Sequence, residues 1–172
     1  MILTGYSTER LIFKEISFDH FDQWLKFFED PQTSNHWKEE RESPQRECEK
    51  WYQKQFSRYA EHRGGMNALI EKASGKLVGH AGLLIQTVDR KSEWEIAYSL
   101  LPEFWNKGFA IEAAQKCKEV AFSNQLSKSL ISIISITNLP SQKVAIKNGM
   151  SIDKQTVYRG NDVYIYRVFS EG

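Results

Sequence analysis

The sequence predicts a mixed α/β (α+β) fold, an α/β/α sandwich in which helices flank a twisted, largely antiparallel sheet. Two observations support this fold class. Short apolar runs typical of strands are interleaved with longer runs at helical spacing, in the order strand, two helices, three strands, helix, strand, helix and two strands. A strand–helix–strand unit also lies near the centre of this order, between groups of consecutive strands.

The first third of the chain is predicted to be mainly helical. A strand at residues 10–16 precedes a helix at residues 17–30, which Pro31 ends. A polar surface loop follows at residues 33–42. A second helix then begins at Ser43-Pro44, with Ser43 as its cap, and the pair Gly64-Gly65 ends this helical half.

The remainder is predicted to alternate between strands and helices. We expect strands at residues 66–71, 77–87, 92–101, 130–136, 152–158 and 163–169, and helices at residues 108–123 and 138–148. Residues 159–162 should turn the last two strands into a hairpin. Asn138 is the expected cap of the last helix and Gly149 its terminator.

Composition narrows the class of protein. A chain of 172 residues, 41% of them hydrophobic, suits one domain over residues 1–172, with a core that needs neither metals nor disulfides. The net charge of +1 argues against a broad basic face for nucleic acid, and no apolar run is long enough to cross a bilayer. The N-terminus does not resemble a signal peptide. Cys117 is expected to be a buried free thiol, so a reducing cytoplasm is the expected compartment.

The junction before the third helix gives the first chemical signal. A strand runs into a short turn, and a helix rich in small residues begins at Gly108, which offers unpaired N–H groups and the positive end of the helix dipole to an anion. Gly108 and Ala110 keep side chains out of the way, and Lys107 adds positive charge. By itself a glycine at such a junction usually reflects turn geometry alone.

Longer blocks around this junction resemble the GNAT superfamily of acetyltransferases. The sequences E-I-A-Y at residues 95–98 and P-E-F-W-N-K-G-F-A-I-E-A at residues 102–113 are similar to E-[LI]-G-Y and P-x-[YF]-W-G-[KR]-G-[YF]-A-x-E-A. These patterns belong to the branch that holds ribosomal-protein N-terminal acetyltransferases and spermidine acetyltransferases. Ala97 and Asn106 stand where that branch has glycine, and Trp105 replaces the leading Gln or Arg of the superfamily pattern [QR]-x-x-G-x-[GA].

Four further blocks resemble the same branch in the same order. They are T-E-R-L at residues 8–11, G-H-A-G-L at residues 79–83, N-L-P-S at residues 138–141 and K-N-G-M at residues 147–150. The resemblance implies the GNAT fold. It also implies direct transfer of an acetyl group, within a ternary complex, from acetyl-CoA as co-substrate to a primary amine of a protein N-terminus or small molecule.

The resemblance further implies where acetyl-CoA binds. Backbone groups of Ser99, Leu100 and Leu101 would pair with the pantetheine arm. The pyrophosphate would be held by the turn and helix start made of Trp105, Asn106, Lys107, Gly108, Phe109 and Ala110. Asn138 and Lys147 are further candidates for contacts with the cofactor, although a helix cap and a favourable place on the helix dipole explain them equally well.

Acetyl transfer to an amine is helped by a base, because a primary amine is mostly protonated near neutral pH. Glu93 and Glu95 lie two residues apart on one predicted strand, so their side chains share a face. The match to E-[LI]-G-Y selects Glu95 as the catalytic base. Glu93 is a candidate substrate contact, with a solvated strand carboxylate as the simpler interpretation.

The leaving thiolate needs at most a hydrogen bond. Ala145 stands where many GNAT enzymes have a tyrosine acid, so Ser141 is the catalytic candidate for this role, although an ordinary serine in the first helical turn would look the same. A backbone N–H group between Tyr98 and Leu101 would stabilise the oxyanion.

The acceptor is not determined by the sequence. His36 and Trp37, in the polar loop, are the candidates for substrate contact. The four histidines lack metal-ligand spacing, so no metal site is expected. Two alternatives stay open, namely a polyamine or aminoglycoside as acceptor and a non-catalytic module that binds acetyl-CoA. We expect a monomer or homodimer without nucleic-acid or membrane partners.

Overall fold

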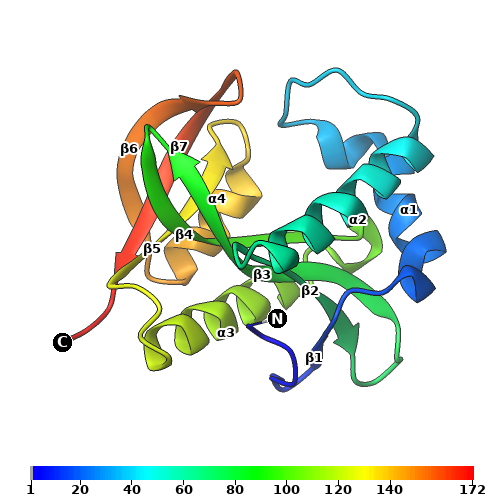
Figure 1. Cartoon of the computed structure of the whole chain (residues 1–172), viewed down its shortest axis with the longest axis horizontal. Helices are drawn as coiled ribbons and strands as arrows, with labels where there is room; N and C mark the ends of the chain where they lie inside the picture. The colour runs from blue at the N-terminus through cyan, green and yellow to red at the C-terminus, as the bar shows by residue number, and fades with distance from the viewer. Residues whose placement is uncertain (1) are drawn as a thin grey trace.

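Seven strands form one mixed sheet in the computed structural model, which describes residues 2–172 (Figure 1). In chain order the strands are β1 (Leu11–Lys14), β2 (Gly64–Glu71), β3 (Leu77–Val88), β4 (Lys91–Leu100), β5 (Ser129–Ser135), β6 (Ser151–Tyr158) and β7 (Asn161–Phe169). The helices are α1 (Phe21–Glu29), α2 (Pro44–Ala60), α3 (Phe109–Ser123) and α4 (Leu139–Lys147), with short 3-10 turns η1 (Phe18–His20), η2 (Pro31–Ser34) and η3 (Pro102–Phe104).

The strands lie in the order β1-β2-β3-β4-β5-β7-β6, and every neighbouring pair is antiparallel except β4 and β5. Helix α2 packs on β2, whereas α3 packs on β3 and β4 from the other side of the sheet (Figure 1). The predicted α/β/α class is therefore confirmed, including the strand–helix–strand unit, which is β4–α3–β5. Among residues 2–172 no helix is long and apolar enough to span a membrane.

The core fills the space on both sides of the central strands. On one side, the buried ring of Trp24 in α1 packs against His80 of β3, with ring centroids 4.3 Å apart. On the other, α3 buries a row of small residues, Ala113, Ala114, Cys117 and Ala121. Cys117 is a buried free thiol, as expected, and Cys48 in α2 is another.

The glycine pair at the end of the helical half belongs to a strand, which corrects the prediction. Gly64 and Gly65 begin β2, because the chain passes there very close to its neighbours. A Cβ atom on Gly64 would lie 2.1 Å from the carbonyl oxygen of Leu83, and one on Gly65 would lie 2.7 Å from the ring of Tyr59. The pair is needed for this close approach of α2, β2 and β3, and the helix already ends at Ala60.

The parallel strands β4 and β5, at the centre of the sheet, are held together at one end only. Their ladder consists of the single pair Glu95 and Ile131, and the strands diverge beyond it. At the closed end, the guanidinium of Arg167 on β7 donates to both carboxylate oxygens of Glu93 on β4, at 2.8 and 3.0 Å. Arg167 also donates to Ser129 of β5 and to Asp153 of β6. One side chain thus ties four strands together.

We predict that Arg167→Met lowers the free energy of unfolding by about 2–4 kcal/mol, because it leaves the poorly exposed Glu93 carboxylate without its partner. Urea denaturation at neutral pH measures this loss. Hydrogen bonding to Arg167 lowers the pKa of Glu93, so the contribution is present above the ordinary glutamate pKa and is lost as the pH falls through the lowered value. Arg46→Met, which removes an exposed helical ion pair, should change stability little. Equal stability of Arg167→Met and the parent chain would contradict the role of the clamp.

Candidate functional site

The divergence of β4 and β5 leaves one edge of β4 without a strand partner. The hydroxyl of Ser132 on β5 donates to the carbonyl of Ile96 at 2.8 Å, and beyond this contact the described residues form no further β4–β5 ladder pair. Helix α4, which follows β5, bounds the opening, and the Tyr98 hydroxyl reaches the carbonyl of Ser141 at 3.4 Å. An unpaired strand edge next to a helix offers backbone donors and acceptors to an extended ligand.

The register of β3 and β4 decides which backbone groups face this opening. The Leu101 N–H group donates to the Val78 carbonyl at 2.9 Å, so by the alternation of an antiparallel ladder the groups of Ser99 also face β3, opposite His80. Backbone groups of Tyr98 and Leu100 face β5 instead. The Leu101 N–H group is thus already bonded within the sheet and the groups of Ser99 face β3, whereas Leu100 keeps an N–H group directed into the opening. The contacts of Ser99, Leu100 and Leu101 with the cofactor stay predictions.

The turn between β4 and α3 leads from this edge to a helix N-terminus. Asn106 and Gly108 both have positive φ, 60° and 81°, which lets the backbone reverse sharply before α3 begins. The first N–H groups of α3 have no partners within the helix, so they can bind an anion. Asn106, Lys107 and Gly108 are exposed, whereas the ring of Phe109 is only 2% exposed and anchors the turn. Trp105 anchors it too, by donating from its ring nitrogen to the carbonyl of Leu100 at 2.8 Å.

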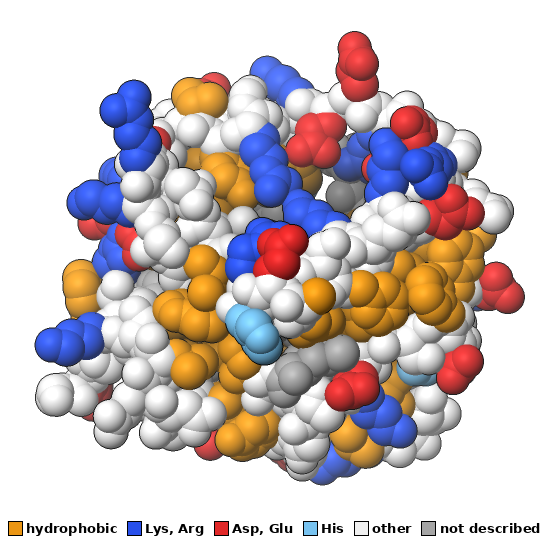
Figure 2. All heavy atoms as spheres, viewed as in Figure 1, with side chains coloured by type: hydrophobic (Ala, Val, Ile, Leu, Met, Phe, Trp, Pro, Cys, Tyr) orange, Lys and Arg blue, Asp and Glu red, His pale blue; other side chains and the backbone are white. Residues whose placement is uncertain are grey.

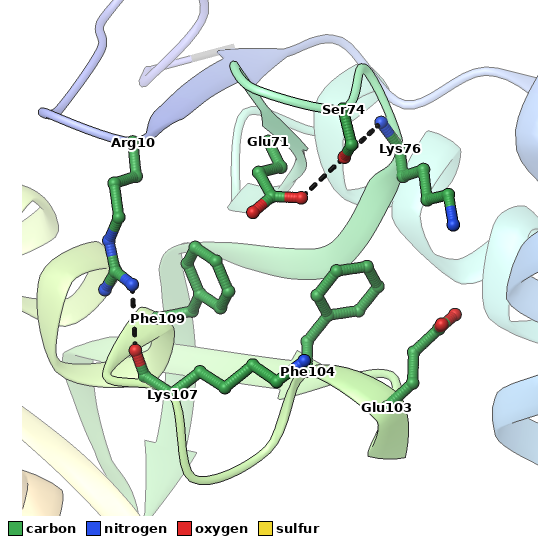
Figure 3. A pocket seen from close by; sticks show the side chains of 8 residues that line it. All are labelled: Arg10, Glu71, Ser74, Lys76, Glu103, Phe104, Lys107 and Phe109. Atoms are coloured by element: carbon green, nitrogen blue, oxygen red, sulfur yellow. Dashed lines mark hydrogen bonds between the residues drawn. The ribbon is translucent and has the colours of Figure 1, made fainter.

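Arg10 supports this turn from the start of the chain (Figure 3). Its guanidinium donates to the Lys107 carbonyl at 2.9 Å, lies 4.2 Å from the ring centroid of Phe109 and pairs with Glu112 of α3 at 3.1 Å. The Thr8 hydroxyl donates to the same glutamate at 2.9 Å. The T-E-R-L block thus supports the turn from nearly 100 residues away, a role that the sequence motif alone did not reveal.

A pocket of about 470 Å³ lies against the same turn (Figure 3). Its lining residues are Arg10, Glu71, Ser74, Lys76, Glu103, Phe104, Lys107 and Phe109. The two phenylalanine rings form its floor, and the three cations lie around its rim. The pocket therefore offers both an aromatic surface and positive charge next to the exposed turn.

Glu95 lies on the opposite face of β4 from α3, where β4 and β5 begin to diverge. Its side chain is 7% exposed, and it accepts from the amide of Gln86 at 3.1 Å and from the Ile133 N–H group at 3.3 Å. Burial raises the pKa of Glu95, although these two hydrogen bonds partly oppose the shift. A buried carboxylate with a raised pKa next to an open cleft is a typical proton acceptor in an active site.

Gln86 of β3 links Glu95 to two residues that sequence reasoning did not single out. Its side-chain oxygen accepts from Arg58 of α2 at 2.9 Å and from the Tyr158 hydroxyl at 3.3 Å. Two donors on the oxygen orient the amide so that its nitrogen donates to Glu95. Arg58 is 1% exposed. A charged residue on the apolar face of a predicted helix was the only sequence signal that could have identified it.

Glu93 is placed differently from Glu95. Both of its oxygens bind Arg167, and the carboxylate lies at the closed end of the β4–β5 pair. Glu93 is not a freely solvated carboxylate, because its side chain is only 17% exposed and pairs with Arg167. The contact of Glu93 with a substrate stays a prediction.

The residues of the N-L-P-S block lie where β5 leads into α4. Asn138 caps α4, its side-chain oxygen accepting from the Ser141 N–H group at 3.2 Å. Ser141 is half-buried in the first turn, and Ala145 is buried one turn later, so no tyrosine hydroxyl is available from that position. The Tyr98 hydroxyl approaches this turn from β4 instead. Lys147 is exposed in the last turn of α4.

The polar loop before α2 lies on the same side of the molecule as Glu95. His36 is 2.9 Å from the hydroxyl of Thr137, just before α4, and the Lys38 N–H group donates to Asn161 at the β6–β7 turn. Trp37 packs on an apolar cluster that includes Ile131, Ile133 and Val163. The loop thus brings His36 and Trp37 close to the carboxylate strand, although their contact with a substrate remains a prediction.

An open strand edge that leads to a helix N-terminus, with a buried carboxylate on the opposite face, is the arrangement of an acyltransferase that uses a coenzyme A thioester. The backbone groups of Tyr98 and the free N–H group of Leu100 suit the amides of a pantetheine arm, and the N–H groups at the start of α3 suit a pyrophosphate. A family model described as the acetyltransferase (GNAT) domain matches residues 10–151. The chain belongs to this family, is an N-acetyltransferase and uses acetyl-CoA.

Known proteins agree with this assignment. An N-acetyltransferase named YnaD from Bacillus subtilis is 31% identical over 101 residues, which cover 55% of this chain and 58% of that protein. An acetyltransferase from Agrobacterium tumefaciens superposes with a TM-score of 0.80 at 20% identity, over 96% of this chain and 94% of that one. RimL, a ribosomal L7/L12 alpha-N-protein acetyltransferase solved with coenzyme A, gives a TM-score of 0.73 at 15% identity, over 97% of each chain. These two structures support the fold.

We predict that Arg10→Ala weakens acetyl-CoA binding about fivefold, because losing the hydrogen bond that supports the turn costs roughly 1 kcal/mol of preorganisation. Titration calorimetry with acetyl-CoA measures the change. Lys14→Ala, which removes an exposed cation from the same strand region, is the matched control and should bind normally. An unchanged affinity in a folded Arg10→Ala sample would show that the turn does not need this support.

Proposed function

We propose that this enzyme transfers the acetyl group directly to a primary amine within a ternary complex, with Glu95 as the catalytic base. The single observation that carries the proposal is the position of Glu95, buried where β4 and β5 diverge and facing away from α3. A ligand along the open edge of β4 and an acceptor on the α2 side of the sheet would meet at this point. The acceptor is either a protein N-terminus or a small-molecule amine.

The residues supply the proton transfers that the reaction needs. Acetyl-CoA contributes an activated carbonyl, whose bond to sulfur breaks as the amine nitrogen bonds to carbon. Glu95 takes the proton that the amine loses, through a water molecule, while the hydrogen bonds from Gln86 and Ile133 hold the carboxylate in place. The Leu100 N–H group is the candidate donor to the developing negative charge on the carbonyl oxygen.

The departing sulfur is expected to lie near the first turn of α4. We propose that the Ser141 hydroxyl donates a hydrogen bond to it, while the Tyr98 hydroxyl holds this turn in place by donating to the Ser141 carbonyl at 3.4 Å. Burial raises the pKa of Tyr98 to about 12, so this phenol keeps its proton at neutral pH. In this proposal the Ser141 hydroxyl takes the place of the tyrosine that is absent at Ala145.

We predict that Glu95→Gln lowers turnover about a hundredfold at neutral pH, while the affinity for acetyl-CoA is kept. In the parent enzyme, turnover should rise with pH as the carboxyl, with its raised pKa, loses its proton. This dependence on the Glu95 carboxyl should vanish in the variant, so that the pH profile of its turnover follows only the ionisation of the amine. Release of coenzyme A thiol, measured from pH 5 to pH 9 with an acceptor found by screening, tests this.

Calorimetry on the same variant separates catalysis from folding. A sample that binds acetyl-CoA normally and turns over at the parent rate across the whole pH range would rule out Glu95 as the base. Asp22→Asn, which neutralises an exposed carboxylate on α1, is the control and should leave the pH profile unchanged.

A further inference from the structure

A second pocket, of about 500 Å³, lies on the acceptor side of the sheet, and its wall is basic. It is bounded by α2, by the β3–β4 hairpin and by the β6–β7 hairpin. The charged residues that line it are Lys54, Arg58, Arg63, Arg159 and a single acid, Asp89. Figure 2 shows Lys and Arg side chains gathered around a hollow in the upper part of this face.

The acids next to this pocket form ion pairs with Lys154, outside the lining, and with Arg63, one of the lining cations. Asp89 pairs with Lys154 at 2.9 Å and also accepts from Thr156, and Glu61 pairs with Arg63. By contrast, Lys54, Arg58 and Arg159 form no ion pair within the described residues 2–172. Glu39, on the exposed loop, and the buried Glu95 are the remaining carboxylates that act on them. The pocket therefore has an excess of positive charge.

Arg58 is the most informative of these cations, because it is 1% exposed. Its two used N–H groups donate to neutral acceptors, the Ile85 carbonyl and the Gln86 side chain, each at 2.9 Å, while its Nε has no partner. Burial lowers the pKa of Arg58, yet a guanidinium stays charged in proteins. A buried charge without a counter-ion is costly, so an anionic ligand would satisfy it.

The cations that line the pocket create a positive local potential. The pKa of Lys54 is lowered to about 8, mainly by loss of hydration and further by the positive charges of Arg159 and Arg58, although Glu39 and Glu95 act in the opposite direction. The same potential would repel a polycation such as a polyamine or an aminoglycoside. An amine that brings its own anion would instead be attracted, and the potential would favour its neutral, nucleophilic form.

The pocket is connected to the proposed base. Gln86 lines it and donates to Glu95 at 3.1 Å. Tyr158 lines it as well and donates to the same glutamine. A ligand whose anion contacts Arg58 can therefore place a nearby amine toward Glu95.

We propose that the acceptor is a primary amine that also carries a carboxylate or phosphate, which binds Lys54, Arg58 and Arg159 while the amine lies at Glu95. This inference rests on the proposed function, since it identifies the acceptor class of the same site. The anion can belong to a small molecule or to an acidic side chain near the N-terminus of a peptide.

Matched acceptors test the proposal and separate the two sources. O-phosphoethanolamine and ethanolamine differ only in the phosphate, and two hexapeptides that begin with the same serine differ in having acidic or neutral residues after it. Wherever a pair contains a substrate, we expect the kcat/KM measured by thiol release to be at least about tenfold higher for the anionic member. Spermidine should be a poor acceptor. Equal rates within both pairs, or a preference for spermidine, would overturn the proposal.

Variants locate the effect in the pocket. Lys54→Gln combined with Arg159→Gln should reduce the preference for the anionic members at least about tenfold without changing the affinity for acetyl-CoA. Both side chains lie outside the buried core, so this variant avoids the folding cost of replacing Arg58. Lys128→Gln, which removes one exposed cation between α3 and β5, should leave the preference unchanged. An undiminished preference in the double variant would contradict the assignment.

Direct binding distinguishes failure of this inference from failure of the proposed function. Calorimetric titration of O-phosphoethanolamine and of the acidic peptide into the enzyme with coenzyme A needs no turnover. Binding of either ligand that the double variant loses, without thiol release from any acceptor, would support the anion pocket and refute acetyl transfer to these amines. Absence of binding by both ligands would overturn the pocket, whatever the enzyme acetylates.

Discussion

The divergence of β4 from β5 is the constraint on which the other features of this molecule depend. The two strands are parallel and share a single ladder pair, and Arg167 holds them together at one end through Glu93. A strand that leaves its neighbour exposes backbone groups that must be satisfied by another partner. Here the exposed edge of β4 leads directly into the turn before α3, so strand edge and helix N-terminus form one continuous surface, on which we propose that acetyl-CoA binds.

The same divergence separates the two substrates. Side chains of β4 alternate between the faces of the sheet, so Tyr98 lies toward α4 while Glu95 lies toward α2. The cofactor side is therefore built mainly of backbone groups, which any sequence of suitable shape can supply. The acceptor side is built of side chains, including the chain of contacts from Arg58 through Gln86 to Glu95.

Arginine side chains have different surroundings at the turn before α3 and in the basic pocket lined by Arg58. At the turn, Arg10 supports a carbonyl and an aromatic ring, and its charge is shared with Glu112. In the basic pocket, Arg58 has no such partner and is held only by neutral groups. This contrast explains why a net charge of +1 for the whole chain says little about the ligand, since the excess is local.

The sequence by itself determined the order of elements and the cap at Asn138, because each depends on local spacing. It also predicted an anion-binding turn at Gly108 and Glu95 as the base from contiguous motifs, and both of these stay proposals. It did not place the ends of the second helix and β2, since the need for Gly64 and Gly65 arises from contacts with Leu83 and Tyr59. Nor could it pair Glu93 with Arg167, orient the backbone of Leu101 or bring Arg58 to Gln86. Those relations join residues that are distant in the chain or depend on strand register, so only the tertiary structure decided them.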